Sequence, residues 1–268
     1  MQITANEFSQ LRNLIYRIAG IHLSDAKRVL LVGRLSKRLR ELHLRSFTEY
    51  FHHVTKLDSA DELQLMVDLL TTNETYFFRE PEHFNFLQAL ASRHRASLGG
   101  GFRVWSAASS TGEEAYSIAM VLADTMGSEP WEVVGTDIST QVLVKAERGH
   151  YTMDRISGIP QKYLKKYCLK GMREQHGTML LCRELRERVH FLQSNLLNPE
   201  QGLGKFDVVF LRNVLIYFDN PTKSKVISNL IPFLKSDGHF IVGHSETISG
   251  ITDSLTAIQP TIYRQVHR

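Results

Sequence analysis

The sequence of 268 residues predicts an α/β protein in which an all-helical N-terminal part precedes an open, mostly parallel sheet. The main observation is an apolar segment of strand length, residues 103–107, followed by a turn of small residues and then by apolar positions at helical spacing. Further short apolar segments alternate with helical patterns, which is typical of parallel sheets covered by helices. The first 70 residues, by contrast, show helical patterns only.

Four helices are expected in the N-terminal part. Thr4 and Glu7 form a capping-box pattern at the start of the first helix, and Gly20 suits its end. The second helix combines a stripe of apolar residues with a densely basic remainder. The four helices are expected over residues 4–20, 25–42, 46–54 and 59–70.

The basic residues of the second helix include Arg28, Arg34, Lys37 and Arg38. Such a helix face is often simply solvated. However, a face of one sign on a chain whose formal charge is only +4 also suits an acidic partner, either a protein or a nucleic acid. Aromatic residues that could stack on bases are absent from this helix, so a nucleic-acid partner is less favoured than a protein partner.

Bulk composition points to a globular protein of one large or two smaller domains, with 43% hydrophobic residues. Two cysteines, Cys168 and Cys182, match no disulfide framework and no zinc-binding spacing. No signal peptide and no membrane-spanning apolar segment is evident. We therefore expect a cytoplasmic protein without a bound metal.

The sheet domain continues in order along the chain. Residues 151–188 interrupt the alternation, and part of this segment is expected to form a small inserted antiparallel hairpin. Pro260 falls within the final predicted strand, which is tolerable only at a sheet edge or bulge. The remaining strands are expected over 131–135, 189–193, 206–211, 239–243 and 257–265, with helices over 139–148 and 219–234.

The turn after the first strand indicates a nucleoside site. It contains one glycine, Gly112, followed by Glu113 and Glu114, and therefore matches neither GxGxxG nor the phosphate-binding GxxxxGK[ST] pattern. Acidic residues at this place disfavour a dinucleotide or ATP but suit S-adenosylmethionine (SAM), which carries an ammonium and a sulfonium group. Asp137, at the end of the second strand, is placed to hold a ribose. The alternative is that the two acids merely stabilise a helix N-terminus.

Polar residues also follow the next two strands, at the carboxyl edge where open α/β sheets bind ligands. Asn195 and Leu196 come after the third strand, where an adenine would lie. Arg212 and Asn213 end a buried strand, and Tyr217 lies one turn further on. The alternatives are a loop-capping asparagine and a tyrosine packed between helix and sheet.

The polar segment 71–80 precedes a helix that is expected to begin near Pro81. Asn73 or Thr75 could serve as its N-cap. Near the C-terminus, His244, Ser245 and Glu246 offer residue types of a hydrolase triad, but no GxSxG elbow accompanies them. We therefore reject nucleophilic and metal catalysis.

Six segments in order, TTNETYFFRE, RVWSAASSTGEEAYSIAM, GTDIS, SNLL, FDVVFLRNVLIYFD and GHSE, resemble the chemotaxis receptor methyltransferases, the CheR family. The resemblance covers nearly the whole chain. It implies an all-α domain (residues 1–70), a linker with a connecting helix (71–100) and a Rossmann-like class I SAM-dependent methyltransferase domain (101–268). A small β-subdomain is expected to be inserted at about 160–188.

The resemblance further implies methyl esterification of glutamates on the cytoplasmic helices of chemoreceptors, with S-adenosylhomocysteine (SAH) as by-product. Cofactor contacts are expected from Asn73, Thr75, Arg79, Glu113 or Glu114 (Glu113 by preference), Asp137, Asn195, Leu196, Arg212 and Asn213. Tyr217 and Arg79 are the predicted catalytic residues. Receptor docking is expected at Arg28, Arg34, Lys37 and Arg38. A monomer without nucleic-acid partner or membrane insertion is expected.

Some members of the family bind a receptor C-terminal peptide by strand addition to the inserted subdomain. The loop LKGMREQHGTML lacks the extra glycines associated with such members, so a peptide-independent enzyme is predicted. Three rival functions stay open at this point: a SAM methyltransferase acting on a small molecule or RNA, a nicotinamide oxidoreductase, and a non-catalytic binding module.

Overall fold

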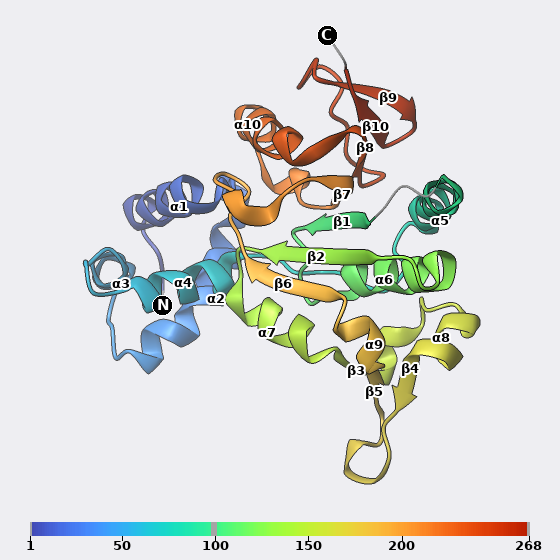
Figure 1. Cartoon of the computed structure of the whole chain (residues 1–268). Coiled ribbons are helices and arrows are strands. Elements are labelled where there is room, and N and C mark those ends of the chain that lie inside the picture. Colours follow the sequence, from blue (N-terminus) through green and yellow to red (C-terminus); the bar gives the residue numbers. More distant parts are fainter. Residues whose placement is uncertain (1, 98–100, 267–268) are drawn as a thin grey trace.

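A seven-stranded sheet in the order β6-β2-β1-β7-β8-β10-β9 organises the C-terminal two thirds of the chain in this computed structural model, which describes residues 2–97 and 101–266 (Figure 1). The first five strands in this order are parallel, β10 pairs antiparallel with β8, and β9 pairs antiparallel with β10. Its strands are β1 (Phe102–Ala107), β2 (Trp131–Asp137), β6 (Val189–Gln193), β7 (Phe206–Leu211), β8 (Leu234–Val242), β9 (Leu255–Gln259) and β10 (Ile262–Gln265).

Successive residues of the central strands face opposite sides of the sheet and enter two separate apolar clusters. Val104 and Val208 belong to the cluster that α5 and α6 cover, whereas Trp105 and Val209 pack against α10. The helices of this part are α5 (Pro81–Ala96), α6 (Glu113–Met126), α7 (Thr140–Arg148), α8 (Gln161–Tyr167), α9 (Arg183–Arg186) and α10 (Asn220–Leu230). Burial on both faces explains why the central strands are apolar throughout.

The N-terminal part forms a helical unit with an apolar cluster of its own. Its helices are α1 (Ala5–Ala19), α2 (Arg28–Glu41), α3 (Phe47–Val54) and α4 (Ala60–Leu70). The predicted capping box of Thr4 and Glu7 is present, and Gly20 ends α1 in the left-handed conformation. In Figure 1 these helices lie at the end of the sheet toward which the arrows of β2 and β6 point.

Hydrogen bonds join the helical unit to the carboxyl edge of the sheet. The His22 amide donates to the Tyr217 carbonyl, the Tyr16 hydroxyl to the Asp219 carboxylate, and the Gln64 side chain to the Ile138 carbonyl. The carboxyl ends of the strands therefore face a wall of helices rather than open solvent.

A second, three-stranded antiparallel sheet in the order β3-β5-β4 is inserted between α7 and β6. Its strands are β3 (His150–Thr152), β4 (Cys168–Lys170) and β5 (Thr178–Leu181). The prediction of an inserted hairpin is confirmed for β4 and β5, but β3 begins the insertion about ten residues before the predicted start at residue 160.

Three local predictions were wrong. The final segment is a hairpin, since β9 and β10 reverse direction at Pro260 and Thr261, so Pro260 lies in a turn and β10 is an inner strand. The N-cap of α5 is Glu80, with φ 58°, and not Asn73 or Thr75, although Pro81 is the first helical residue as expected. The strand predicted over 239–243 begins five residues earlier, at Leu234, which shortens the preceding helix.

The linker prediction over residues 71–100 extends in part outside the described residues, at 98–100. Among the described residues, no helix combines the length and the apolar character needed to cross a membrane. Short 3-10 helices complete the structure: η1 (Asp25–Lys27), η2 (Met153–Ile156), η3 (Arg173–Gln175), η4 (Gln201–Leu203), η5 (Leu215–Tyr217) and η6 (Ile231–Phe233).

Candidate functional site

A cavity of about 340 Å³ lies between the carboxyl edge of the sheet, the helical unit and the linker that joins them. Its volume and its mixture of apolar and polar walls are typical of small-molecule sites. The helical unit contributes Ala19, Ile21, His22, Leu23, Lys27 and Leu30 to its wall. Of the predicted cofactor and catalytic residues, the structure places the following at this cavity: Asn73, Thr75, Arg79, Glu114, Asp137, Asn195, Leu196, Arg212, Asn213 and Tyr217.

Arg212 is the buried centre of the polar wall, with a side chain that is 1% exposed. Its guanidinium binds Glu114 at 2.8 Å and Glu80 at 3.0 Å, and it also donates to the Arg79 carbonyl. The Ser106 hydroxyl donates to the other oxygen of Glu114 at 2.7 Å. Two carboxylates therefore share one guanidinium, and of these Glu114 lines the cavity whereas Glu80 is not among the described residues that line it.

The two carboxylates differ in pKa. Burial raises the pKa of Glu114, although Arg212 and Ser106 act in the opposite direction. Burial would also raise the pKa of Glu80, but the contacts with Arg212, Asn213 and the His244 amide outweigh it and hold that pKa below its ordinary value.

Glu113 does not face the cavity, which contradicts the preference for Glu113 over Glu114. It is the first residue of α6, fully buried, and its carboxylate binds Arg155 at 2.5 Å and the Thr111 hydroxyl at 2.6 Å. Because Arg155 lies in η2 of the inserted region, Glu113 fastens that region to the turn after β1. Adjacent helical positions point about 100° apart, so one acid binds the insertion and the other lines the cavity.

Asp137 ends β2 and is 6% exposed. Its two oxygens accept from the amides of Ser110 and Ser139, each at 2.9 Å. Burial raises the pKa of Asp137, whereas these backbone N–H groups lower it. A carboxylate offers about four lone pairs, so capacity remains for the hydroxyl groups of a ribose.

Asn195 lines the cavity, but its side chain already has partners. The amide nitrogen donates to the Ile18 carbonyl at 2.7 Å, and the oxygen accepts from the Leu197 amide. Asn195 thereby binds the loop after β6 to the end of α1, which disfavours recognition of a purine edge by this side chain. Leu196 remains available to pack against a ring.

Arg79 and Tyr217, the predicted catalytic residues, both reach the cavity. Arg79 lies over the Tyr76 ring at 5.5 Å and donates to the Glu74 carbonyl at 3.2 Å. Tyr217 ends η5 and is half-buried, and its hydroxyl has no hydrogen-bond partner within the part of the chain that the structure describes. Its phenol is thus available to a ligand.

Two of the predicted docking residues have partners inside the helical unit. Arg34 donates to the carbonyls of Leu70 and Thr71, and Arg38 is held by Glu62 and Glu41. Arg28 is half-buried and lies over the Phe8 ring at 5.3 Å. Of the four predicted docking residues, Lys37 alone is fully exposed, with a side chain that is 81% exposed and an ammonium 3.8 Å from Glu41.

Sequence reasoning missed two carboxylates that support the site. Glu80 binds both Arg212 and Asn213, and Glu246 accepts from the amides of Asn213 and Gly243 at 2.8 Å each. Asn213 has φ 57°, a conformation that Glu246 stabilises. The FFRE and GHSE segments were noted, but nothing in their spacing shows that their acids meet.

The residues present fit SAM. Glu114 and Asp137 are acidic, which suits an ammonium, a sulfonium and a ribose diol, while Leu196, Ile138 and other apolar side chains suit an adenine. The sequence contains neither the GxGxxG nor the GxxxxGK[ST] pattern that binds a pyrophosphate. The donor set therefore favours this cofactor over a dinucleotide.

Comparisons with known proteins show which family the chain resembles. Residues 6–71 match the family model "CheR methyltransferase, all-alpha domain", and residues 73–264 match "CheR methyltransferase, SAM binding domain". The chain is 41% identical over 267 residues to Chemotaxis protein methyltransferase 2 of Pseudomonas aeruginosa, covering 97% of this chain and 93% of that one. It is 41% identical over 259 residues to the chemotaxis protein methyltransferase of Escherichia coli, covering 96% and 89%.

These matches confirm the predicted methyltransferase fold, with its all-α N-terminal part and small antiparallel sheet, and SAM as the cofactor. The chain belongs to the CheR family and is a SAM-dependent methyltransferase of chemotaxis.

Proposed function

We propose that the chain binds SAM in this cavity and methylates glutamate side chains on the cytoplasmic helices of chemotaxis receptors, with SAH as the second product. The observation that carries the proposal is the meeting of Glu114, Asp137, Arg79 and Tyr217 at one cavity between the sheet and the helical unit. The relatives named chemotaxis protein methyltransferases support the substrate class.

For this reaction the protein mainly has to align the glutamate carboxylate with the methyl group. A receptor glutamate has an ordinary pKa below about 5, so it is ionised at pH 7 and needs no general base. SAM, when bound, supplies a methyl group attached to a sulfonium sulfur. After transfer of the methyl group, this sulfur is left as a neutral thioether. Holding the carboxylate in line with the methyl group lowers the activation free energy by several kcal/mol.

We assign this alignment to Arg79 and Tyr217. Arg79 is held by the Glu74 carbonyl and the Tyr76 ring, and its remaining N–H groups can orient a carboxylate. The Tyr217 hydroxyl can donate to the same carboxylate or contact the methyl group. Asp137 would hold the ribose, Glu114 the ammonium end, and Leu196 the adenine.

The receptor would dock beside the cavity, on the helical unit. The exposed cations of the helical unit include Lys27, Lys37 and Arg40, and of these three Lys27 lines the cavity. Arg34 and Arg38 are not part of this surface, because they serve contacts within the fold. The proposal includes a monomer that works in the cytoplasm and does not use a receptor C-terminal peptide.

Calorimetric titration with SAH tests the cofactor site. We expect micromolar binding by the wild type and at least tenfold weaker binding by Asp137→Asn. Asp253→Asn is the matched control, because Asp253 is exposed and is not among the residues lining the cavity. No binding by the wild type would contradict the site itself.

Transfer of a radiolabelled methyl group to a receptor cytoplasmic fragment tests the substrate. Glutamate methyl esters release methanol in base, so the label must be base-labile. Base-stable label, or transfer to RNA or small molecules but not to the receptor, would favour the rival methyltransferase functions. Tyr217→Phe should lower kcat without changing SAH affinity, and full kcat would remove Tyr217 from the mechanism.

A further inference from the structure

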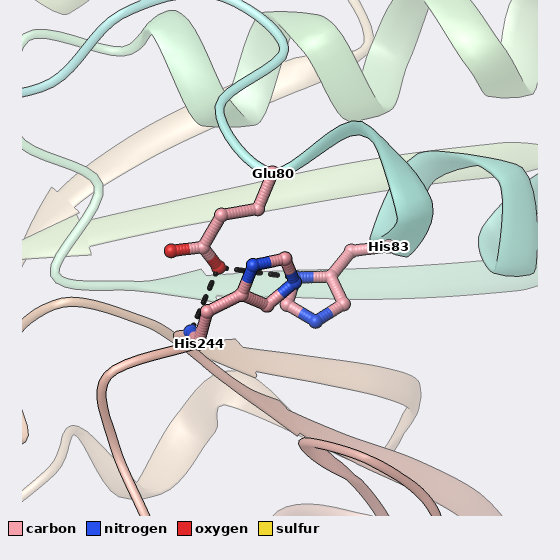
Figure 2. A group of neighbouring side chains, drawn as sticks. All are labelled: Glu80, His83 and His244. Carbon is pink, nitrogen blue, oxygen red and sulfur yellow. Dashed lines mark hydrogen bonds and ion pairs between the residues drawn. The ribbon is translucent and has the colours of Figure 1, made fainter.

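Beside the Arg212 network lies a cluster of three potential metal ligands, Glu80, His83 and His244 (Figure 2). Glu80 is the N-cap of α5, His83 lies in its first turn, and His244 follows β8. Neither histidine is among the described residues that line the cavity. The cluster is therefore adjacent to the SAM site but separate from it.

The donor atoms are close enough for one ion. One ligand atom from each residue lies within 4.8 Å of the other two, and Glu80 Oε2 is 3.5 Å from His83 Nδ1. Tetrahedral zinc with bonds of about 2.0–2.2 Å separates its ligand atoms by about 3.4 Å. Glu82, whose carboxylate is 3.8 Å from His244 Nε2, can supply a fourth ligand.

His83 is oriented as a metal ligand requires. The Thr261 hydroxyl donates to the Pro260 carbonyl, so it accepts from His83 Nε2 at 2.7 Å, which places the ring proton on Nε2. His83 Nδ1 then carries a lone pair, is buried, and has no hydrogen-bond partner among the described residues. This lone pair lies near the Glu80 carboxylate, and a cation between the two acceptors would satisfy both (Figure 2).

We propose that Glu80, His83 and His244 bind a divalent transition-metal ion of the Zn²⁺ class, and that this ion weakens SAM binding. Two imidazoles and one carboxylate favour Zn²⁺ or Co²⁺ over Mg²⁺ or Ca²⁺, which prefer oxygen ligands. The inhibitory part rests on the proposed function of the cavity, whereas the metal site itself does not.

Glu80 couples the two sites. Its Oε2 accepts from Arg212 Nη2 at 3.0 Å and from the His244 amide at 3.1 Å. A metal ion on this oxygen competes with Arg212 for its lone pairs and repels the guanidinium. Because Arg212 also positions Glu114 at the cavity, the ion would disturb the wall that holds SAM.

Titration of the full chain with Co²⁺ tests the metal site through its visible ligand-field absorption. We expect one bound equivalent, and at least tenfold weaker binding in His83→Ala and in His244→Ala. His190→Ala is the matched control, since His190 is exposed on β6 and lies outside the cluster. No binding by the wild type, or binding unchanged in both cluster variants, would overturn the site.

SAH titration with and without Zn²⁺ tests the coupling. We expect at least a tenfold loss of SAH affinity in the wild type and no loss in His244→Ala, which keeps its backbone amide and binds SAH normally without metal. Co²⁺ binding that leaves SAH affinity unchanged would overturn the inhibition. Failure to bind SAH without any metal would instead contradict the proposed function.

Discussion

Arg38 in the helical unit and Arg212 on the sheet are each held by two carboxylates, but only Arg212 is held at the wall of a cavity. Arg38 binds Glu62 and Glu41 between α2 and α4, and its side chain is 25% exposed. Arg212 binds Glu80 and Glu114 and is 1% exposed. The residue types and distances are nearly the same in both clusters.

The difference lies in what surrounds each cluster. The second carboxylate of Arg38, Glu41, is about half exposed, so water solvates the excess charge and the cluster acts as a surface clamp. Both carboxylates of Arg212 are largely buried, with side chains that are 13% and 14% exposed, and Glu114 lines the cavity between two parts of the chain. An arginine with two acids therefore indicates a ligand site only where solvent does not already balance the charge.

Arg212→Lys should have the largest effect. An ammonium cannot bind both carboxylates and the Arg79 carbonyl with the guanidinium's geometry, so Glu80 and Glu114 lose their fixed positions. We expect SAH affinity to fall at least about 100-fold, equivalent to about 3 kcal/mol. Calorimetry measures this, with circular dichroism to establish that the variant is folded. A folded variant that binds SAH normally would show that the network does not support the cofactor site.

Arg38→Met disrupts the other arginine cluster, in the helical unit. It leaves Glu62, which is 9% exposed, without its cation, so we expect unfolding in urea to require about 2 kcal/mol less free energy. SAH affinity should stay at the wild-type value, because Arg38 does not line the cavity. A selective loss of SAH binding with unchanged stability would mean that the two arginine clusters do not differ as described.

The sequence predicted the sheet well where each strand is a short apolar run bounded by polar residues. The strands predicted over 189–193 and 206–211 agree with β6 and β7 residue for residue. The last hairpin was missed because its turn at Pro260 and Thr261 lacks an Asn-Gly or Asp-Gly pair. Thr261 adopts φ 63°, which is uncommon for a β-branched residue and invisible in the hydrophobic pattern.

The sequence predicted which strand ends and loops form the site, but only some of the side chains that face the cavity. Residues that follow parallel strands must gather at one edge, so Asp137 and Arg212 could be placed at the cavity. Which of Glu113 and Glu114 faces the cavity depends on Arg155, which binds Glu113 from 42 positions further along the chain, and no local pattern contains that contact. Arg34 and Arg38 likewise find their partners on α4 and in the linker.

Glu114→Gln and Glu113→Gln compare two neighbouring acids within one helix turn. Glu114→Gln removes the charge that we propose faces the ammonium of SAH, and we expect about tenfold weaker binding, or about 1.4 kcal/mol. Glutamine at 113 leaves Arg155 without its carboxylate and should lower the unfolding free energy while leaving SAH affinity within about twofold. Equal losses of SAH affinity in both variants would contradict their separate placement.

Glu7→Gln tests a carboxylate that is held without any arginine and should have the smallest effect. Glu7 accepts from the amides of Thr4 and Thr48, at 2.8 and 2.9 Å, and thereby joins α1 to α3. Burial would raise the pKa of Glu7, but these hydrogen bonds lower it below the ordinary 4.5. A lowered folded pKa means that the carboxylate stabilises the fold above about pH 4.5 and that this contribution is lost as the pH falls through the folded value. Urea unfolding should therefore show a difference of about 1 kcal/mol between wild type and variant at pH 7, shrinking as the pH falls below 4.5. A difference that stays constant or grows on acidification would show that hydrogen-bond geometry, and not the charge of Glu7, stabilises the junction of α1 and α3.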